Sequence, residues 1–318
     1  MSTEASVAST ILALLRLPGI GPVRANRMLA RLGSEGRVLT DGSVGETAIA
    51  SLLDERQRGA WPGSLEWARH TLAQVQAIGG EVLAFSDEKY PRRLTGLLGD
   101  GAPPLLFVIG RVDLLEASGI GFCGSRHASE KGLATAADCA DQLARQGLNV
   151  VSGYAAGVDT AVHRAALAAG GTTSIVLAEG LLRFRHKSTI SATRDTEQTV
   201  VLSEFAPDAP WTVANAMQRN KTICALSRAM VLIEAGLTGG SMAAGKACLA
   251  MGLPLFAAVY DGMPSSAAGN VELLKLGAQR LMRNRTLNRA NLAPLLTAIE
   301  EARAQRLPTP EIALVAAR

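Results

Sequence analysis

From residue 81 onward, short apolar runs alternate with longer stretches in which apolar residues recur at helical spacing. A run of about four to eight apolar residues that is bounded by turn residues is typical of a strand buried on both faces. The runs lie at residues 81–85, 104–110, 119–124, 148–153, 173–178, 200–204, 229–235 and 254–260. Because parallel strands need a helical crossover between them, this alternation predicts an α/β fold. We expect a Rossmann-like, doubly wound, mostly parallel sheet covered by helices on both faces.

The pattern of the flanking segments predicts how the chain is divided. Residues 1–80 carry only helical spacing, which predicts a small helical N-terminal domain, with Trp61 and Trp67 as anchors of its core. Residues 81–290 form the predicted sheet domain, and residues 291–318 are expected to be a short C-terminal tail.

Within the helical domain, the string LPGIGP at residues 17–22 interrupts two helical stretches and predicts a sharp turn. This arrangement resembles a helix-hairpin-helix. In that motif the glycines, here Gly19 and Gly21, let the backbone approach a DNA phosphate and leave amide donors at the next helix start. A plain αα-hairpin that only packs on its neighbours is the alternative, and the residues leave both interpretations open.

Composition narrows the class of protein. Hydrophobic residues make up 48% of the 318 residues and charged residues 19%, which is enough apolar material to bury a core. No run of about 18 uninterrupted apolar residues occurs, and the first residues lack the order of a secretory signal, so we expect a cytoplasmic protein without a membrane partner. The four cysteines lie far apart without CxxC spacing, so we expect buried thiols, no metal site and no cofactor.

Positive residues gather in three segments, although the net charge is only +4. A solvated surface is the alternative to a nucleic-acid contact for each segment. The clusters are Arg183, Arg185, His186, Lys187 and Arg194; Arg219 and Lys221 on either side of Asn220; and Arg280, Arg283, Arg285 and Arg289.

Three predicted strands end in glycine-containing loops that lead into helices. Ligands of open α/β sheets bind at such loops, because the helix N-termini offer free amides. In the first loop Gly124 permits a tight turn, Ser125 offers a hydroxyl, and Arg126 offers a planar fork that matches phosphate oxygens. The string GIGFCG at residues 119–124 fits GxGxxG, but its first two glycines lie inside the predicted strand, so we reject a dinucleotide fingerprint.

The second loop, residues 152–159, contains Gly153 and Gly157. Asp159 and His163 follow at a spacing of four on the next helix, which makes a mutual hydrogen bond easy. A catalytic dyad is one interpretation, and a structural pair that shapes the loop is the favoured one.

The third loop, residues 234–241, contributes Gly239, Gly240 and Ser241. The residues from Gly240 to Lys246 nearly match a Walker A sequence, but Ala247 stands where a magnesium-binding hydroxyl is required. We also expect Ser241 to cap the following helix, which would place Lys246 on that helix. NTP hydrolysis is therefore not expected.

Several strings match, in order, the pattern of a known family. They are YPRRL at 90–94, PPLLF at 103–107, GSR at 124–126, SGYAAGVDTAVHRAAL at 152–167, QRNKTICALSRAMVLIEA at 218–235 and TGGSMAAGKACLAMGLPLFA at 238–257. The chain resembles the DprA (DNA processing A, or Smf) family from about residue 80 to 285. That family has SGxAxGID-x-x-AHR-x-AL and RNR-x-I-x-x-LS elements followed by a glycine-rich helix start.

The resemblance implies a Rossmann-like domain that binds single-stranded DNA rather than an enzyme. It also implies a homodimer that protects the strand and loads the recombinase RecA during natural transformation. In the family the GSR arginine and the basic RNR positions serve DNA binding, which carries over to Arg126, Arg219 and Lys221. The other candidate phosphate contacts are Gly124, Ser125, Gly153, Gly157, Asn220, Gly239, Gly240 and Ser241. Further candidates for DNA contact are Gly19, Gly21, Arg183, Arg185 and Lys187.

The chain departs from the family's pattern in three respects. After Leu177 it has AEGLLRFRHKSTISATRD where the family has a turn and a Tyr-Pro-Pro-Glu-Asn stretch, so the role of the basic loop 182–194 is open. The family's C-terminal winged helix is expected to be absent. Aromatic residues make up only 4% of the chain, which favours sequence-independent binding of the DNA backbone.

Two other classes of protein compete with DNA binding. Rossmann proteins that resemble lysine-decarboxylase-like phosphoribohydrolases carry a GGxGT-x-x-E signature, of which only Gly239, Gly240 and the small residue Ser241 are present here, without the acid. Such a protein would be an enzyme on, or a sensor of, nucleotide-derived ligands. The third possibility is an interaction protein that uses its helical N-terminus to recruit a repair complex.

Overall fold

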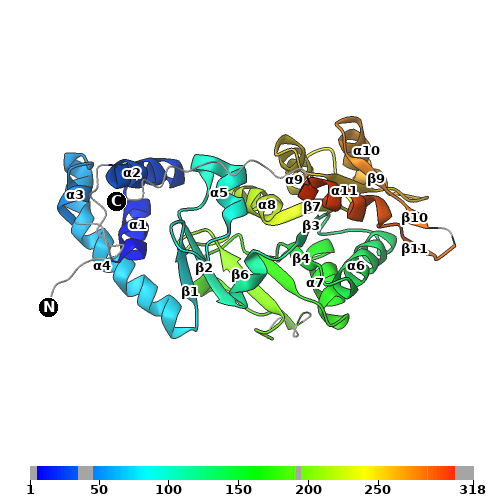
Figure 1. Cartoon of the computed structure of the whole chain (residues 1–318), viewed down its shortest axis with the longest axis horizontal. Helices are drawn as coiled ribbons and strands as arrows, with labels where there is room; N and C mark the ends of the chain where they lie inside the picture. The colour runs from blue at the N-terminus through cyan, green and yellow to red at the C-terminus, as the bar shows by residue number, and fades with distance from the viewer. Residues whose placement is uncertain (1–5, 35–45, 189, 191–194, 285, 305–318) are drawn as a thin grey trace.

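A nine-stranded sheet forms the centre of the computed structural model, which describes residues 6–34, 46–188, 190, 195–284 and 286–304 (Figure 1). Its strand order is β1-β2-β6-β5-β4-β3-β7-β8-β9. The bounds are β1 Glu81–Ala84, β2 Leu105–Gly110, β3 Gly119–Cys123, β4 Asn149–Ser152, β5 Thr173–Val176, β6 Thr199–Ser203, β7 Ser227–Leu232, β8 Leu255–Ala258 and β9 Gln279–Leu281. A separate two-stranded ribbon joins β10, Arg283–Asn284, to β11, Arg289–Ala290.

The predicted fold class is confirmed. Each of the eight apolar runs overlaps one strand. In the order of the sheet, all neighbouring strands from β6 through β5, β4, β3, β7 and β8 to β9 run parallel. Within this sheet, the pairs β1–β2 and β2–β6 are antiparallel. The sequence did not reveal β9, because it has three residues and only Leu281 of them is buried.

Strand β3 marks the point where the winding of the sheet reverses. The chain proceeds from β3 through β4 and β5 to β6 on one side, and then returns to place β7 on the other side of β3. The crevice beyond the carboxyl ends of strands at such a reversal is the usual ligand site of open α/β sheets.

Helices cover both faces of the parallel sheet. One face is covered by α5 Arg92–Leu98, α8 Val213–Leu226, α9 Gly240–Ala250 and α10 Ala268–Lys275. The other is covered by α6 Glu130–Arg145, α7 Val158–Ala168 and α11 Ala293–Ala304. Strand residues alternate between these cores, as period two requires: Ile120 and Phe122 face α6 and α7, whereas Cys123 faces α8.

The helices before the sheet are α1 Val7–Arg16, α2 Pro22–Ser34, α3 Glu46–Ala50 and α4 Glu55–Ala77. They lie at one end of the molecule, beside β1 (Figure 1), and share a core with Phe107, Ile175 and Val201 of the sheet. Trp61 is buried in this core, and Trp67 is half-buried beside it. Because this core is continuous with the sheet, the division at residue 80 stays a prediction.

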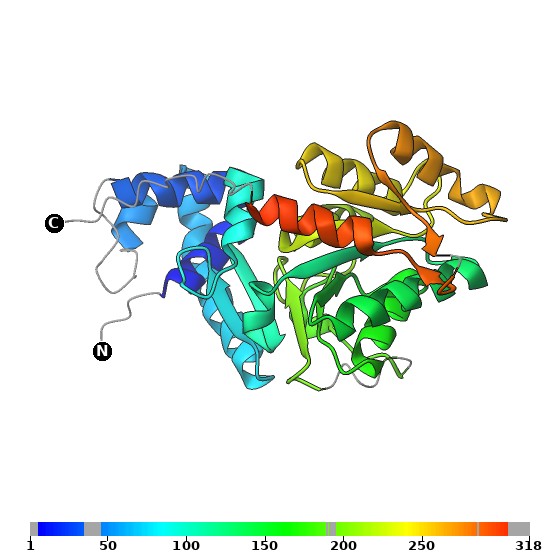
Figure 2. The same ribbon diagram turned by 45° about the vertical axis from the view of Figure 1, so that its right-hand side comes forward.

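The segment after residue 290 differs from the expected tail. It contains α11, whose side chains Leu295 and Ile299 are buried against the core that holds α6 and α7. Figure 2 shows α11 lying along the body of the molecule. The sequence does carry a signal for this helix, because Leu292, Leu295, Leu296 and Ile299 recur at helical spacing, and the prediction of a tail overlooked it. Residues 305–318 of the expected tail lie outside the described residues.

The expected burial of the cysteines is confirmed. Cys123, Cys139, Cys224 and Cys248 are all buried free thiols. In the part of the chain that the structure describes, no helix has both the length and the apolar character needed to cross a bilayer.

The position of α11 yields a stability prediction. Leu295 is fully buried, whereas Thr297 on the same helix is exposed. Truncation of a buried leucine removes apolar contacts and leaves a cavity, so Leu295→Ala should lower the free energy of unfolding by about 2–5 kcal/mol. Thr297→Ala should change it by less than about 0.5 kcal/mol. Urea unfolding measures both, and equal effects would show that α11 is not part of the folded core.

Candidate functional site

Two adjoining pockets lie at the carboxyl edge of the sheet. The first, which we call the switch pocket, has a volume of about 380 Å³ and is lined by Cys123–Arg126 after β3, Ala155 and Asp159 after β4, and Glu234 after β7. The second, the side pocket, has a volume of about 420 Å³ and lies beyond β4 and β5. Arg126, Ala155, Trp211 and Arg219 line both pockets, so the pockets form one continuous surface.

The loops after β3 and β4 touch each other through their backbones. Gly157 has φ of +76°, and a Cβ atom there would lie 2.4 Å from the carbonyl oxygen of Ser125 and 2.6 Å from that of Arg126. A Cβ at Gly124 would lie 2.5 Å from the Val158 side chain. Only glycine fits at either position without displacing the other loop. The loop contact holds Arg126 at the pocket, where its side chain is exposed.

Asp159 and His163 shape this loop without bonding to each other, so the expected mutual hydrogen bond is absent. The Asp159 carboxylate accepts hydrogen bonds from the Ser152 hydroxyl and the Ala155 amide, both at 3.0 Å. His163 Nε2 lies 2.6 Å from the Gly153 carbonyl oxygen, and Nδ1 lies 2.7 Å from the Thr173 hydroxyl. Complete burial lowers the pKa of His163. These contacts support the structural-pair interpretation.

Arg219 lies under both pockets and is only 7% exposed. Its Nη1 donates a hydrogen bond of 2.7 Å to the Val176 carbonyl oxygen. Nε is buried without a hydrogen-bond partner among the described atoms. A Cβ atom at Gly153 would lie 1.7 Å from Arg219 Nη1, so glycine is required there to make room for the guanidinium.

The charge of Arg219 is poorly solvated. Burial lowers the pKa of its guanidinium, whereas the carboxylates of Asp159 and Glu179 raise it. Because arginine stays protonated in proteins, the site keeps a largely desolvated positive charge that an anion can reach from either pocket.

The third loop starts its helix earlier than expected. The N-cap of α9 is Gly239, with φ of +95°, rather than Ser241, which lies within the first turn. A positive φ at Gly239 lets the chain turn into the helix two residues sooner. No side chain caps this helix start, so its first amides are suited to an anion, and Gly240 and Ser241 line the switch pocket. Asn220 also lines the pocket and donates to the Gly240 carbonyl oxygen at 3.1 Å.

Lys221 does not join the other predicted cations. It is exposed on α8, and it lines neither pocket. Residues that are two positions apart in an α-helix point about 200° apart around its axis. Lys221 therefore lies across α8 from Arg219. Its role in DNA binding stays a prediction without support from this geometry.

Trp211, which lies between β6 and α8, was not predicted from the sequence. The residue is 46% exposed, and the guanidinium carbon of Arg126 lies 5.3 Å from the centroid of its ring. An exposed tryptophan is unusual unless it has a partner, and this one borders both pockets. The signal in the sequence that could have identified it was a tryptophan shortly before the RNK string at residues 219–221.

Glu234, which also lines the switch pocket, is 1% exposed but well bonded. It accepts hydrogen bonds from the Ser129 amide at 3.0 Å, from the Ser129 hydroxyl at 2.6 Å and from the Tyr260 hydroxyl. Burial, followed by the bond to Glu234, raises the pKa of Tyr260 to about 12. Glu234 therefore fixes the start of α6.

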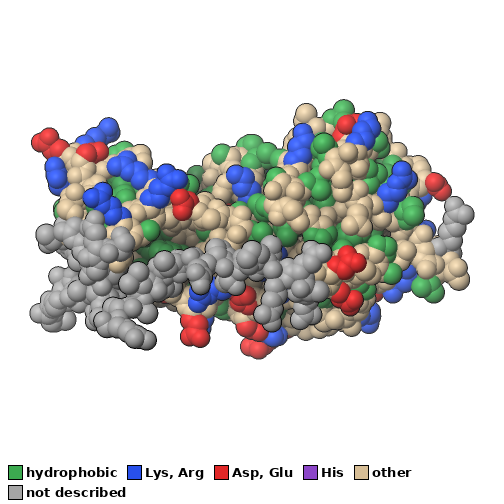
Figure 3. Space-filling view, turned by 45° about the horizontal axis from the view of Figure 1, so that its top comes forward, with side chains coloured by type: hydrophobic (Ala, Val, Ile, Leu, Met, Phe, Trp, Pro, Cys, Tyr) green, Lys and Arg blue, Asp and Glu red, His purple; other side chains and the backbone are tan. Residues whose placement is uncertain are grey.

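Other candidates lie away from the pockets. Gly19 and Gly21 lie in the connection between α1 and α2 and line neither pocket. Figure 3 shows basic side chains over these N-terminal helices. Arg289 forms ion pairs with Asp138 and Asp141, at 2.5 and 2.6 Å, which supports a structural role for that part of its cluster. Arg194 and Arg285 lie outside the described residues.

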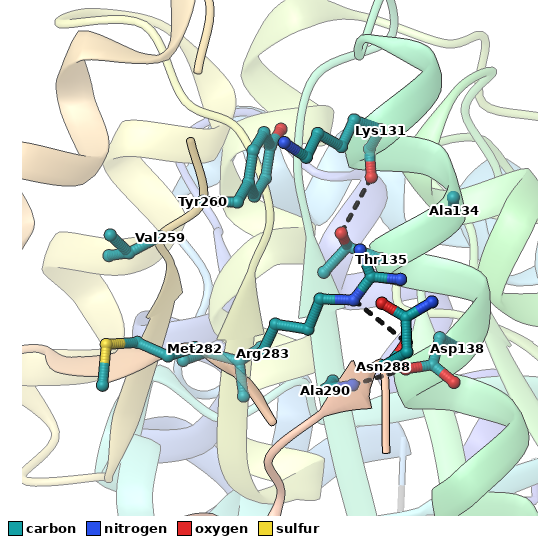
Figure 4. A pocket seen from close by; sticks show the side chains of 11 residues that line it. Lys131, Ala134, Thr135, Asp138, Val259, Tyr260, Met282, Arg283, Asn288 and Ala290 are labelled. Atoms are coloured by element: carbon teal, nitrogen blue, oxygen red, sulfur yellow. Dashed lines mark hydrogen bonds between the residues drawn. The ribbon is translucent and has the colours of Figure 1, made fainter. Parts of the chain in front are cut away.

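A smaller pocket of about 110 Å³ lies between α6 and the β10–β11 ribbon (Figure 4). Lys131, Thr135, Tyr260 and Arg283 line it. Arg283 comes from the third basic cluster, and no candidate contact of the three glycine-containing loops lines this pocket. Within the described ranges, no group of three or more histidine, cysteine or acidic residues is placed to hold a metal ion.

Comparisons with known proteins point to one family. A sequence model of the family described as DNA recombination-mediator protein A matches residues 81–290. Protein Smf of Synechocystis is 26% identical over 299 residues, which cover 90% of this chain and 73% of that protein. A putative DNA processing protein DprA of Mycobacterium tuberculosis is 31% identical over 231 residues, which cover 69% of this chain and only 59% of that protein.

Solved structures share the fold. The DprA structure from Streptococcus pneumoniae matches with a TM-score of 0.68 and 25% identity, over 82% of this chain and 95% of that one. DprA from Helicobacter pylori, described for its unique mode of single-stranded DNA binding, matches with a TM-score of 0.56 and 22% identity. That match covers 71% of this chain and 96% of the other.

The contact between the first two loops predicts how a methyl group at Gly157 changes the stability of the protein. Gly157→Ala combines positive φ with a backbone clash, so it should lower the free energy of unfolding by at least about 2 kcal/mol. Gly240→Ala, whose new atom would meet only Asn220 at 3.8 Å, should change it by less than about 1 kcal/mol. Chemical denaturation of the two variants compares them, and equal stabilities would contradict the backbone contact.

Proposed function

The chain belongs to the family of DNA recombination-mediator protein A, also named DprA or Smf, and from this membership we propose that it binds single-stranded DNA along the switch and side pockets. The observation that carries the proposal is the convergence of Arg126, the buried Arg219 and the uncapped start of α9 at the reversal of the sheet. Cations and free amides at one edge are suited to a row of phosphates.

Binding would be dominated by the DNA backbone. Arg126 supplies an exposed guanidinium at the surface, and Arg219 supplies a buried, hydrogen-bonded one below it. The amides at the start of α9 add donors that carry no sequence preference. Trp211 offers one ring on which a base can stack beside Arg126. A single stacking platform agrees with binding that tolerates any sequence.

The bound strand would be protected and delivered to the recombinase RecA, and the protein would act as a homodimer in DNA uptake by natural transformation. Family membership supports this part of the proposal. The chain covers between 59% and 73% of the lengths of the two curated relatives compared above, so the functions of their remaining segments are not transferred.

The alternative of a phosphoribohydrolase-like enzyme or ligand sensor receives less support. Asp159 and Glu234, the carboxylates that line the switch pocket, both accept hydrogen bonds from structural donors. A general acid or base must instead be free to reach the substrate. The pocket chemistry therefore favours binding over N-glycosidic cleavage.

Two variants, each of which removes one positive charge, compare the pocket residue Arg126 with Lys221, which only the sequence motif suggested as a DNA contact. Arg126→Ala should weaken binding of oligo-dT about tenfold or more and reduce the salt slope by about one, because Arg126 lines the pockets. Lys221→Ala should weaken it less than about threefold. Fluorescence anisotropy at several salt concentrations measures both effects. A larger effect at Lys221, or binding that is insensitive to salt, would contradict the proposed site.

Stacking at Trp211 has its own signature. Trp211→Ala should weaken binding by about tenfold, within the range of one lost base–aromatic contact, and Trp211→Phe should restore most of the affinity. Binding should quench tryptophan fluorescence in the native protein and in Arg126→Ala at saturating DNA, but not in Trp211→Phe. Unchanged affinity in Trp211→Ala would exclude the stacking role.

A further inference from the structure

We propose that the side pocket binds the terminal phosphate of a DNA strand, a phosphomonoester, in preference to an internal phosphodiester. The inference rests on the proposed function, because it requires a strand along the same edge of the sheet. It adds a chemical preference for strand ends to that function.

Positive charge surrounds the side pocket. Five positive side chains and one carboxylate line it; they are Arg126, Arg183, Arg185, Lys187, Arg219 and Glu179. A terminal phosphate carries about 1.5 to 2 negative charges near neutral pH, because its second pKa is about 6. An internal phosphodiester carries one. A pocket with this excess of positive charge therefore stabilises the monoester more strongly.

Three of these cations are held by carbonyl oxygens rather than neutralised by carboxylates. Arg183 Nε donates to the Asp208 carbonyl oxygen at 2.6 Å, and Lys187 Nζ donates to that of Tyr154. Arg185 Nη1 donates to the carbonyl oxygens of Leu182 and Phe184, at 3.1 and 2.8 Å. Carbonyl oxygens orient a cation but leave its net charge in place.

Cations elsewhere in the fold are treated differently. Arg111 pairs with Asp113, and Arg289 pairs with two aspartates. Among the ion pairs of the described residues, none includes a cation of the side pocket. Their positive charge is available to a ligand.

A buried guanidinium lies beneath the pocket. Arg219 is 7% exposed and lines the side pocket, and its buried Nε has no hydrogen-bond partner among the described atoms. The charge of this guanidinium is therefore incompletely compensated by the protein. An anion in the pocket reaches it through the part of the side chain that remains exposed.

The rings of the pocket favour a phosphate over a base. The ring of Tyr154 is already in contact with Lys187, whose Nζ lies 4.2 Å from the ring centroid, and with Phe184 at 5.2 Å between centroids. Its hydroxyl accepts a hydrogen bond of 2.8 Å from the Lys187 amide. The other lining ring, Trp211, lies at the border with the switch pocket. The side pocket itself is therefore predominantly an ionic site.

The path of the strand fits an end site. The two pockets together lie beyond β7, β3, β4 and β5, which are consecutive in the sheet. Three interstrand spacings of about 4.8 Å give an edge of roughly 14 Å. A strand whose terminal phosphate occupies the side pocket can continue over Trp211 and Arg126 into the switch pocket.

The test compares oligonucleotides that differ only at their ends. Short oligo-dT with a 5′-phosphate, a 3′-phosphate or hydroxyls at both ends is titrated into the full chain by fluorescence anisotropy with an internal label. We expect one phosphorylated form to bind about five- to tenfold more tightly than the hydroxyl form. Thymidine monophosphate, added as a competitor at millimolar concentration, should reduce this preference if the pocket reads the monoester alone.

Variants assign the preference to the pocket. In the double variant Arg183→Gln/Lys187→Met, the ratio of the two dissociation constants should fall to about one, whatever happens to the absolute affinity. Arg280→Ala removes an exposed charge from β9, which lines neither pocket, and should keep the ratio. Thermal unfolding of each variant shows that it is folded, and Arg185→Gln serves as a second pocket variant if the double variant is not.

The possible outcomes distinguish the preference for strand ends from the proposed binding of single-stranded DNA. Tight binding of all three oligonucleotides with equal affinity would overturn the end preference and leave single-strand binding intact. A preference that survives the double variant would also overturn it, because the preference would then arise elsewhere. Failure of every oligonucleotide to bind would overturn the proposed function and this inference together.

Discussion

The position of the Arg219 guanidinium is the constraint on which the candidate site depends. Moving a charge out of water costs several kcal/mol unless partners replace the lost hydration. Here the Val176 carbonyl oxygen accepts one hydrogen bond, and the carboxylates of Asp159 and Glu179 offset part of the charge. One donor remains unsatisfied. The rest of the edge is built around this group: Gly153 lacks a side chain because the guanidinium occupies that space.

The loops that surround Arg219 are fixed by short-range contacts rather than by a bound ligand. Asp159 and His163 hold the loop after β4, Gly157 lets that loop touch the one after β3, and Glu234 holds the start of α6. The site is consequently preorganised, so little ordering is needed when a strand binds. The exposed side chains of Arg126 and Trp211 supply the adaptable part of the surface. This division suits a ligand that is a flexible, repetitive polyanion.

The sequence predicted the sheet well because buried parallel strands leave short apolar runs bounded by turn residues. It also predicted the glycine-rich loops, because a loop at the carboxyl end of a strand needs glycine where two backbones meet. It failed where the outcome depends on direction or distance. Arg219 and Lys221 are neighbours in the sequence, yet the helix turns one into the site and the other away from it. Trp211 carries no periodic signal, and the start of α9 was set by Gly239 rather than by the better capping residue. Helix α11 was predictable from the helical spacing of Leu292, Leu295, Leu296 and Ile299 and was overlooked.

The central claim is that a single strand of DNA lies across the carboxyl edge of the sheet, over Arg219. A crystal structure of the protein with a short oligo-dT tests it most directly. The account predicts phosphate oxygens within hydrogen-bonding distance of the Arg126 guanidinium and of the first amides of α9, with a base beside the indole ring of Trp211. A strand bound instead along the α1–α2 hairpin, with both pockets holding only solvent, would contradict it.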